Sequence, residues 1–597
     1  MQRDTIFVVD FGSQYTHLLA RRIRELGVYS EIVSPLAEDN VFSGAKGIIL
    51  SGGPKSVYDK DAVPFNKKIF ELGLPLLGLC YGHQLVGQYF GGKVVAGAIK
   101  EYGKARLSVF GGKLFEGLPK AFFVWMSHGD KIISLPLGFE GVARTLDCEY
   151  AAIENLEKNV FGLQFHPEVT NTEFGLKIIE NFVFGVCKCE KSWSMSNYLN
   201  LIKSDIKARV GSKKVFLLAS GGVDSSVCLV LLASSLPKNN VVAIHIDTGF
   251  MRKDESFLVK QEIEKLGVKS LVVDAKKTFF SALKNVVDPE EKRNIIGKLF
   301  VDILISKLKE LKVSKGKWLL AQGTIYPDTI ETGGTENSNK IKTHHNRAPI
   351  IMDMIKEGLV IEPLKDLYKD EVRELAKLIG LSDVLINRRP FPGPGLAIRV
   401  LCSSGKDKVD SDLDREIRFS SKEFGYESFL LPVKAVGVQG DNRTYRNVVL
   451  LKGEFDYKKI ETLSTFITNN FSGINRVIYL IEPKIVQEVM VEESYLTKER
   501  VSALQEADAI ATEIVDGKPF AKEIWQFPVV LLPIRLNQNG QTIVLRPVSS
   551  KEAMTATFFP LEENVAKEIA KNVLNIKGIG AVTIDVTHKP PATIEWE

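Results

Sequence analysis

Short apolar runs separated by amphipathic segments fill the amino-terminal and middle parts of the chain. Such unbroken runs are typical of strands buried on both faces, and the segments between them have helical spacing. The pattern therefore predicts an α/β architecture in which helices cover mostly parallel sheets. The predicted strands lie at 5–9, 47–50, 75–79, 215–219, 241–247, 271–274 and 318–323.

The carboxyl-terminal part contains an internal repeat. Leu-Leu-Pro-Val-Lys at 430–434 returns as Leu-Leu-Pro-Ile-Arg at 531–535, and Gly-Ile-Asn-Arg-Val-Ile-Tyr at 473–479 returns as Gly-Ile-Gly-Ala-Val-Thr-Ile at 578–584. Each copy has the pattern of two strands, a helix and a final strand, which predicts two tandem α+β units. A proline- and glycine-rich stretch at 389–396 marks a domain boundary before them. The predicted domains are 1–200, 201–400, 401–515 and 516–597.

Composition narrows the class of protein. The chain has 597 residues, 25% charged and 45% hydrophobic, as in a globular protein of several domains. Its net charge of +5 is small for this length and gives no sign of a nucleic-acid partner. Its six cysteines lack disulfide-like spacing, and neither a signal peptide nor a membrane-spanning run is evident. We therefore expect a cytoplasmic protein without membrane or nucleic-acid partners.

A glycine-rich loop follows the predicted strand at 215–219 and leads into a helix. Its glycines allow backbone N–H groups to approach phosphate oxygens, and the helix amino terminus adds partial positive charge. The Lys-Ser/Thr ending of a Walker loop is absent. The loop resembles the signature of the ATP pyrophosphatases, which cleave ATP between its α and β phosphates. The residues assigned to ATP are Ser220, Gly221, Gly222, Val223, Asp224, Ser225 and Ser226.

A second candidate site surrounds Cys80. This residue lies between Gly78 and Gly82 just after a buried strand, in the pattern of a nucleophile at a sharp strand-to-helix turn. Pro167 favours extended backbone at His166, so His166 and Glu168 point the same way. A thiol, a histidine base and a carboxylate that orients it can form a nucleophilic triad.

Residues 4–190 resemble the class I glutamine amidotransferases. The resemblance implies that Cys80 attacks the glutamine side-chain amide and releases ammonia, with His166 and Glu168 completing the triad. It also implies that backbone N–H groups of Gly53 and Tyr81 form the oxyanion hole, and that Gln84 helps to hold glutamine.

The middle region offers further candidate ligands of ATP. Asp247 ends a predicted strand, where the nucleoside would lie in a doubly wound sheet. Lys342, His344 and His345 follow a glycine- and asparagine-rich segment, which suits a lid that closes cations over departing pyrophosphate. A solvated loop is the alternative interpretation of that segment.

The whole chain resembles the glutamine-hydrolysing GMP synthase family, in its longer, eukaryotic-type form. The resemblance implies that ATP adenylates an oxygen of xanthosine monophosphate (XMP), that pyrophosphate leaves, and that ammonia then displaces AMP to give GMP. It implies a fold of an amidotransferase domain, an ATP pyrophosphatase domain related to the adenine-nucleotide α-hydrolases, and the two α+β units. Mg²⁺ is the expected cofactor, with Asp224 as its candidate ligand. The residues that match the family's XMP ligands are Arg293, Asp441, Gln526, Lys589 and Glu595.

Two features of the chain depart from the family's pattern, and a third feature, the duplicated unit, predicts how the protein assembles. Arg389 stands where the family commonly has histidine, and Arg-Ala-Pro at 347–349 replaces a glycine-rich continuation. The duplicated α+β unit predicts a monomer, because an internal pair can replace the contact between two subunits.

Three other functions remain open. One is a different glutamine-dependent ATP pyrophosphatase, such as NAD or asparagine synthetase, although Gln2 excludes an amino-terminal cysteine nucleophile. Another is a tRNA-modifying relative, which would be expected to carry a basic domain or zinc cysteines. The third is a non-catalytic scaffold, which does not fit a chain with every expected catalytic position filled.

Overall fold

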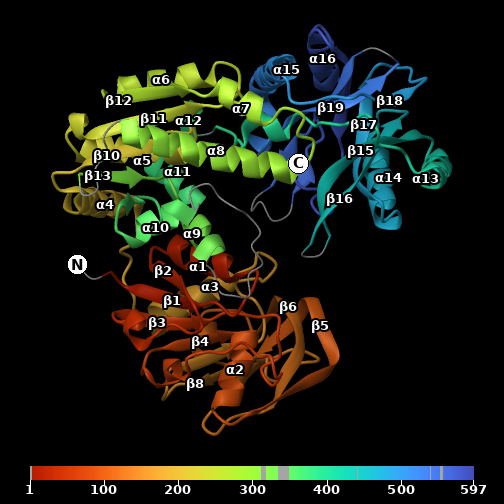
Figure 1. The fold of residues 1–597 in the computed structure, drawn as a ribbon. Helices are drawn as coiled ribbons and strands as arrows, with labels where there is room; N and C mark the ends of the chain where they lie inside the picture. Colours follow the sequence, from red (N-terminus) through yellow and green to blue (C-terminus); the bar gives the residue numbers. More distant parts are fainter. Residues whose placement is uncertain are drawn as a thin grey trace. The chain divides into compact units, whose positions relative to one another are not determined.

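The computed structural model describes residues 3–310, 317–333, 349–386, 388–439, 442–537, 540–550 and 556–597. The chain divides into two compact units (Figure 1). Unit 1 holds the residues up to Asp205 together with helices α9 (Tyr326–Gly333) and α11 (Lys369–Leu378). Unit 2 holds most of the remaining chain, including its carboxyl-terminal end. Among the described residues, no helix has the length and apolar character needed to cross a membrane.

Unit 1 is built on a nine-stranded sheet with the order β2-β1-β3-β4-β9-β8-β7-β5-β6. The strands from β2 to β9 in that order pair in parallel, whereas the rest pair antiparallel. The strands are β1 (Thr5–Val9), β2 (Tyr29–Val33), β3 (Ala45–Leu50), β4 (Leu76–Leu79), β5 (Lys93–Val109), β6 (Ala121–Ser134), β7 (Glu140–Arg144), β8 (Ala152–Asn155) and β9 (Val160–Leu163). The helices are α1 (Thr16–Glu25), α2 (Tyr81–Tyr89), α3 (Gly175–Glu180) and α4 (Met195–Val210), of which α4 continues into unit 2.

The parallel part of this sheet has the apolar strands that the sequence predicts. Every residue of β1, β4 and β9 is buried, because α1 and α3 pack on one face of the sheet and α2 packs on the other. Helix α2 packs on β4 and β9, and α1 packs on β1 and β2. The antiparallel hairpin of β5 and β6 was not predicted, since its strands alternate between buried and exposed residues.

Unit 2 begins with a five-stranded, all-parallel sheet in the order β12-β11-β10-β13-β14. Strand order reverses between β10 and β13, which is where α/β sheets of this kind bind ligands at the carboxyl ends of their strands. The strands are β10 (Lys214–Leu218), β11 (Val241–Asp247), β12 (Lys269–Asp274), β13 (Trp318–Ala321) and β14 (Val360–Ile361). The helices are α5 (Val223–Ser235), α6 (Glu255–Lys265), α7 (Lys276–Ala282), α8 (Pro289–Glu310), α10 (Pro349–Lys356) and α12 (Asp383–Ile386).

The carboxyl-terminal part forms one seven-stranded sheet in the order β15-β16-β17-β23-β20-β19-β18 (Figure 1). Its strands are β15 (Glu427–Gln439), β16 (Asn442–Lys452), β17 (Ile474–Glu482), β18 (Val489–Val491), β19 (Val529–Leu536), β20 (Gln541–Leu545) and β23 (Ile579–Asp585). The helices are α13 (Ser411–Glu423), α14 (Tyr457–Asn470), α15 (Lys498–Asp516) and α16 (Glu563–Val573). A separate two-stranded sheet pairs β21 (Val548–Ser549) with β22 (Thr557–Phe558).

The two sequence repeats are structural repeats. Within each, the first two strands pair antiparallel and the second pairs in parallel with the last, and β17 and β23 then join the repeats antiparallel. The Leu-Leu-Pro motif of each repeat marks the same irregularity: the register shifts after Leu431 in β15 and after Leu532 in β19. Proline lacks the N–H that a sheet ladder needs, so it lies in a bulge.

Candidate active sites

Cys80 lies at the turn between β4 and α2, with a positive φ of 50° that is rare for any residue except glycine. Neither flanking position has room for a side chain, so both must be glycine. A Cβ on Gly78 would lie 2.3 Å from the carbonyl oxygen of Gly82, and a Cβ on Gly82 would lie 2.4 Å from the carbonyl oxygen of Leu50. The sharp turn therefore holds Cys80 at the amino-terminal end of α2, where the N–H groups of the first helical turn point outward.

His166 and Glu168 form a buried pair. Nδ1 of His166 lies 2.7 Å from Oε1 of Glu168, and each residue is 3% exposed. Burial lowers the pKa of His166, but the negative charge of Glu168 and hydrogen bonds with Glu168 and Cys80 outweigh it, so the pKa lies well above its usual value. Cys80 therefore acts on the same ring that Glu168 orients, and the three side chains expected from the sequence lie together.

The residues expected around the Cys80 thiol come from neighbouring loops. A Cβ on Gly53 would lie 3.3 Å from Cγ of Tyr81, so the two residues pack together, and Tyr81 is the first residue of α2. Gln84 is buried in the same helix, and its Nε2 donates to the carbonyl oxygen of Asp130 at 2.9 Å.

Strand β6 contributes residues that the sequence did not single out. The Cys80 thiol donates to the carbonyl oxygen of Ser127 at 3.6 Å, and Asp130 accepts from Gln84. These contacts use backbone atoms, which no residue pattern reveals. The polar Ser-His-Gly-Asp run at 127–130, inside an otherwise strand-like segment, is the signal that could have drawn attention to it.

The phosphate-binding loop candidate lies at the reversal of strand order in unit 2. Gly221 has φ +82°, and Gly222 caps helix α5. The Ser220 and Ser225 hydroxyl oxygens lie 3.1 Å apart, while Ser225 and Ser226 each donate to the carbonyl oxygen of Gly222 at 3.0 Å. The loop is thus a turn with a fixed backbone at a helix amino terminus, which suits an anion.

Arg388 binds the backbone of this loop. The sequence did not predict this contact. Its Nη1 donates to the carbonyl oxygen of Gly221 at 2.7 Å, and its Nη2 pairs with Glu255 at 2.7 Å. Only tertiary structure brings the arginine next to Gly221, so local motifs could not reveal it. A further glycine, Gly323, two residues after β13, packs on the first turn of α5, where its Cβ would lie 3.0 Å from the backbone of Asp224.

Two carboxylates near this loop are candidate ligands of nucleotide or metal. Asp224 lies in the first turn of α5 and is partly exposed. Asp247 ends β11, where it is buried, accepts from the N–H of Gly249 at 2.9 Å and lies 3.2 Å from the Lys276 ammonium. Carboxylate oxygens of this kind are the ligands that Mg²⁺ prefers in proteins.

The carboxyl-terminal tail is folded into unit 2. Both oxygens of Glu595 accept from the buried guanidinium of Arg399, at 2.9 and 2.8 Å. Arg293 on α8 donates to the backbone carbonyl oxygen of Glu597. Arg476, fully buried beside Asp585 and the ring of Trp596, donates to the carbonyl oxygens of Thr593 and Glu595.

The structure describes two of the remaining candidate XMP ligands, Gln526 and Lys589, and each forms an isolated β-bridge. Gln526 bridges to Val548, and Lys589 bridges to Ala556. Asp441 lies outside the described residues, as do the expected lid residues Lys342, His344 and His345 and the departure at 347–348.

Arg389, the departure before the proline- and glycine-rich segment, has defined partners. Its Nη1 pairs with Asp516 at 2.6 Å, and its other guanidinium nitrogens donate to the carbonyl oxygens of Ile524 and Ala521. The arginine therefore ties this segment to the end of α15 and to the residues that follow it.

Three family models match the chain. "Glutamine amidotransferase class-I" matches residues 7–186, "Arginosuccinate synthase N-terminal HUP domain" matches 214–294, and "GMP synthase C terminal domain" matches 418–489 and 513–596. These matches confirm the fold class expected from the sequence: an amidotransferase domain, a HUP-type ATP pyrophosphatase domain and a carboxyl-terminal α+β region.

The chain is also similar to curated proteins over most or all of its length. A protein of Leptospira interrogans named "Probable GMP synthase [glutamine-hydrolyzing]" is 43% identical over 99% of each chain. A GMP synthase of Aquifex aeolicus is 43% identical over 81% of this chain and 98% of its own, and one of Dictyostelium discoideum is 35% identical over 99% of this chain and 94% of its own. Because the Leptospira relative is bacterial and spans the whole chain, the long form is not restricted to eukaryotes, and the eukaryotic-type label is not supported.

The expected activity, glutamine-dependent synthesis of GMP with ATP as co-substrate, agrees with all of these relatives, and none of them supports the alternative functions. The chain therefore belongs to the glutamine-hydrolysing GMP synthase family.

Proposed function

We propose that Cys80, His166 and Glu168 perform the glutaminase half of the reaction. The Cys80 sulfur attacks the carboxamide carbon of glutamine, and His166 gives a proton to the departing ammonia. Water, deprotonated by His166, then hydrolyses the thioester to glutamate and frees the thiol. Glu168 keeps the imidazole oriented through Nδ1, so that the other ring nitrogen serves Cys80.

Backbone donors would stabilise the charge that develops on the carboxamide oxygen. The N–H groups of Gly53 and Tyr81 are our candidates for this oxyanion hole, and Gln84 for holding the substrate. The packing of Gly53 against Tyr81 and the place of Tyr81 in the first turn of α2 support the assignment, because a first-turn N–H has no partner within its helix.

In the synthetase half, Ser220–Ser226 would hold the phosphates of ATP and Asp247 would lie near its nucleoside. The XMP oxygen attacks the α-phosphorus, pyrophosphate leaves, and ammonia then displaces AMP from the adenylated purine. Mg²⁺, held by Asp224 together with phosphate oxygens, would neutralise charge on the departing pyrophosphate. Lys342, His344 and His345 are proposed to close over that leaving group.

XMP is proposed to contact Arg293, Asp441, Gln526, Lys589 and Glu595. The ion pair of Glu595 with Arg399 supports a place for Glu595 in the site, because the pair fixes the carboxylate and leaves each oxygen a second lone pair for a donor of the base or ribose.

We infer a monomer, since β17 and β23 already pair the two repeats within one chain. A cytoplasmic enzyme that acts on small molecules, without a nucleic-acid or membrane partner, fits the nucleotide and amino-acid substrates.

The observation that carries this function is the strained Cys80 turn facing the buried His166–Glu168 pair. The test is a product balance with glutamine, ATP, magnesium and XMP. Glutamate, GMP, AMP and pyrophosphate should form in equal amounts. ADP and phosphate in place of AMP and pyrophosphate would contradict the adenylation step.

A further inference from the structure

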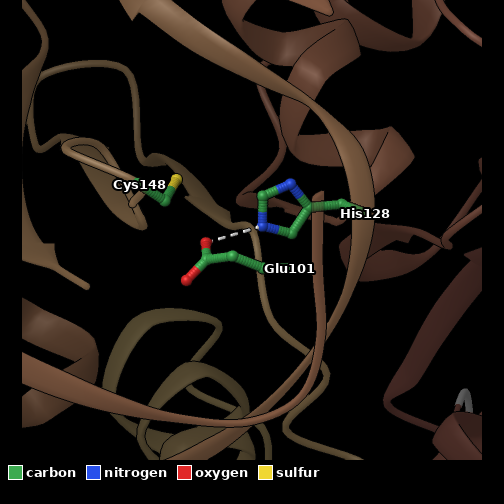
Figure 2. Close-up of side chains that lie close together, drawn as sticks. All are labelled: Glu101, His128 and Cys148. Atoms are coloured by element: carbon green, nitrogen blue, oxygen red, sulfur yellow. Dashed lines mark hydrogen bonds and ion pairs between the residues drawn. The ribbon is translucent and has the colours of Figure 1, made fainter. Parts of the chain in front are cut away.

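Glu101 and His128 face each other across the β5–β6 hairpin of unit 1. They are direct partners in the strand register, and Nε2 of His128 lies 3.0 Å from Oε2 of Glu101 (Figure 2). The side chains are only 9% and 3% exposed. A buried polar pair of this kind calls for an explanation, because its groups must find partners to offset the loss of water.

Every polar atom of the pair has a partner. Nδ1 of His128 lies 2.9 Å from the carbonyl oxygen of Asp130, and Oε1 of Glu101 accepts from the Thr145 hydroxyl at 2.8 Å. Burial raises the pKa of Glu101, but hydrogen bonds from His128 and Thr145 outweigh it and hold the pKa below its usual value. Glu101 is therefore a carboxylate that accepts from two donors.

Cys148 lies near the pair, and one ligand atom from each of the three residues lies within 4.8 Å of the others. Such a group could hold a metal ion, but the hydrogen bonds argue against it. An ion would have to replace the bond between Glu101 and His128, and burial together with the charge of Glu101 raises the pKa of the Cys148 thiol to about 12. In Figure 2 no interaction joins Cys148 to either residue.

The Asp130 carbonyl connects the pair to the Cys80 centre. It accepts from Nδ1 of His128 on one side and from Nε2 of Gln84 on the other, each at 2.9 Å. A carbonyl oxygen only accepts, so Nδ1 must carry a proton, and Glu101 at Nε2 orients the ring for this task. Ser127, the residue before His128, supplies the carbonyl that faces the Cys80 thiol.

We propose that Glu101 and His128 are positioning residues of the glutaminase reaction. They fix the Asp130 carbonyl, and with it the Gln84 side chain and the β6 segment that faces Cys80, in the geometry that binds glutamine. The inference rests on the proposed roles of Cys80 and Gln84. It predicts that loss of the pair raises KM for glutamine more than it lowers kcat, because neither residue touches the reacting atoms.

Four variants separate this role from a merely structural one. His128→Gln places its amide nitrogen near the position of Nε2 and loses the donor to Asp130, whereas His128→Asn keeps a donor near the position of Nδ1. Glu101→Ala removes the ring's partner, whereas Glu101→Gln can still bond to the ring. We expect His128→Gln and Glu101→Ala to raise KM for glutamine about tenfold, as for loss of a charge-assisted hydrogen bond. The KM values of His128→Asn and Glu101→Gln should stay within about threefold of the wild-type value.

Glutamate release gives KM and kcat, and circular dichroism with limited proteolysis checks that unit 1 of each variant folds. Equal KM values for His128→Gln and His128→Asn would overturn the inference, even if Glu101→Ala does not fold. Bound metal in stoichiometric amount, lost in Cys148→Ser together with a rise in KM, would overturn it in favour of a metal site. Cys80→Ala tells the two failures apart: if it still releases glutamate the proposed function fails, and if it is inactive while His128→Gln has a normal KM only this inference fails.

Discussion

The Cys80 centre in unit 1 and the proposed phosphate-binding loop in unit 2 both lie where a parallel strand ends and a helix begins. They differ in what surrounds that turn. Cys80, His166 and Glu168 are 6%, 3% and 3% exposed and come from two short motifs. The loop at Ser220–Ser226 alternates between buried and exposed residues, and the arginine that contacts its backbone, Arg388, comes from a distant part of the sequence, just after α12.

This difference in burial affects the electrostatic environment of each site. The Cys80 centre excludes water by itself, so its charges act in a medium of low dielectric constant before any ligand arrives. The proposed ATP and XMP centre would be completed by its ligands and by segments distant in sequence, so we expect its chemistry to depend on substrate binding and on metal. The glutaminase site should therefore tolerate changes in unit 2 better than the synthetase site tolerates them.

The largest effect is expected from Asp224→Ala. Loss of this proposed metal ligand should slow XMP-dependent pyrophosphate release on the order of a thousand-fold with glutamine or with ammonium, since a bound metal supplies several kcal/mol of charge stabilisation. A coupled pyrophosphate assay measures this, with Asp412→Ala, whose side chain is 85% exposed, as the matched control. Pyrophosphate release at the wild-type rate would remove Asp224 from the site.

A second prediction concerns the tail that carries Glu595. Trp596 is fully buried against Arg476, so Trp596→Ala should destabilise unit 2 by about 3–5 kcal/mol and raise KM for XMP. Chemical denaturation and steady-state kinetics measure the two effects. Phe419→Ala, at a side chain that is 69% exposed, should change neither. A tail that contributes nothing to XMP binding would leave KM for XMP unchanged in a folded variant.

A smaller and local effect is expected from Gly82→Ala. The added Cβ would lie 2.4 Å from the carbonyl oxygen of Leu50, and the forced shift should cost about 1–3 kcal/mol and lower glutamine hydrolysis. Ammonium-dependent synthesis should survive. Gly185→Ala is the control, because a Cβ there meets nothing within 4 Å. Equal melting temperatures and equal glutaminase rates for the two variants would show that the turn can accommodate a Cβ at position 82, against this prediction.

The last prediction concerns the mass of the protein in solution, which should be that of a single chain. If β17 and β23 replace a contact between subunits, the protein should sediment with the mass of one 66.4 kDa chain at micromolar concentration. A mass of twice that value would show that another face forms a dimer.

The sequence predicted those features that depend on neighbours along the chain. Parallel strands, the Cys80 turn, the His166–Glu168 pair and the Ser220–Ser226 loop all follow from short patterns of glycine, apolar runs and chemistry. The repeated Leu-Leu-Pro motif likewise predicted two similar units, although not that their strands would join in one sheet through β17 and β23.

Features that depend on tertiary pairing were beyond the sequence. Glu101 meets His128 only because β5 and β6 pair in one register, and the backbone carbonyls of Ser127 and Asp130 have no signature in residue type. Arg388 reaches Gly221 across 167 positions of sequence, for the same reason. The antiparallel hairpin was missed because alternating burial does not stand out as an apolar run.

The most direct test of the difference between the two centres is Cys80→Ala, assayed with each nitrogen source. If ammonia is made by the buried centre of unit 1 and used by a separate centre, glutamine-dependent GMP formation should be lost, while synthesis from ammonium salts at saturating XMP and ATP should continue near the wild-type rate. Loss of the ammonium-dependent reaction in a folded variant, or GMP formation from glutamine without the thiol, would contradict the account.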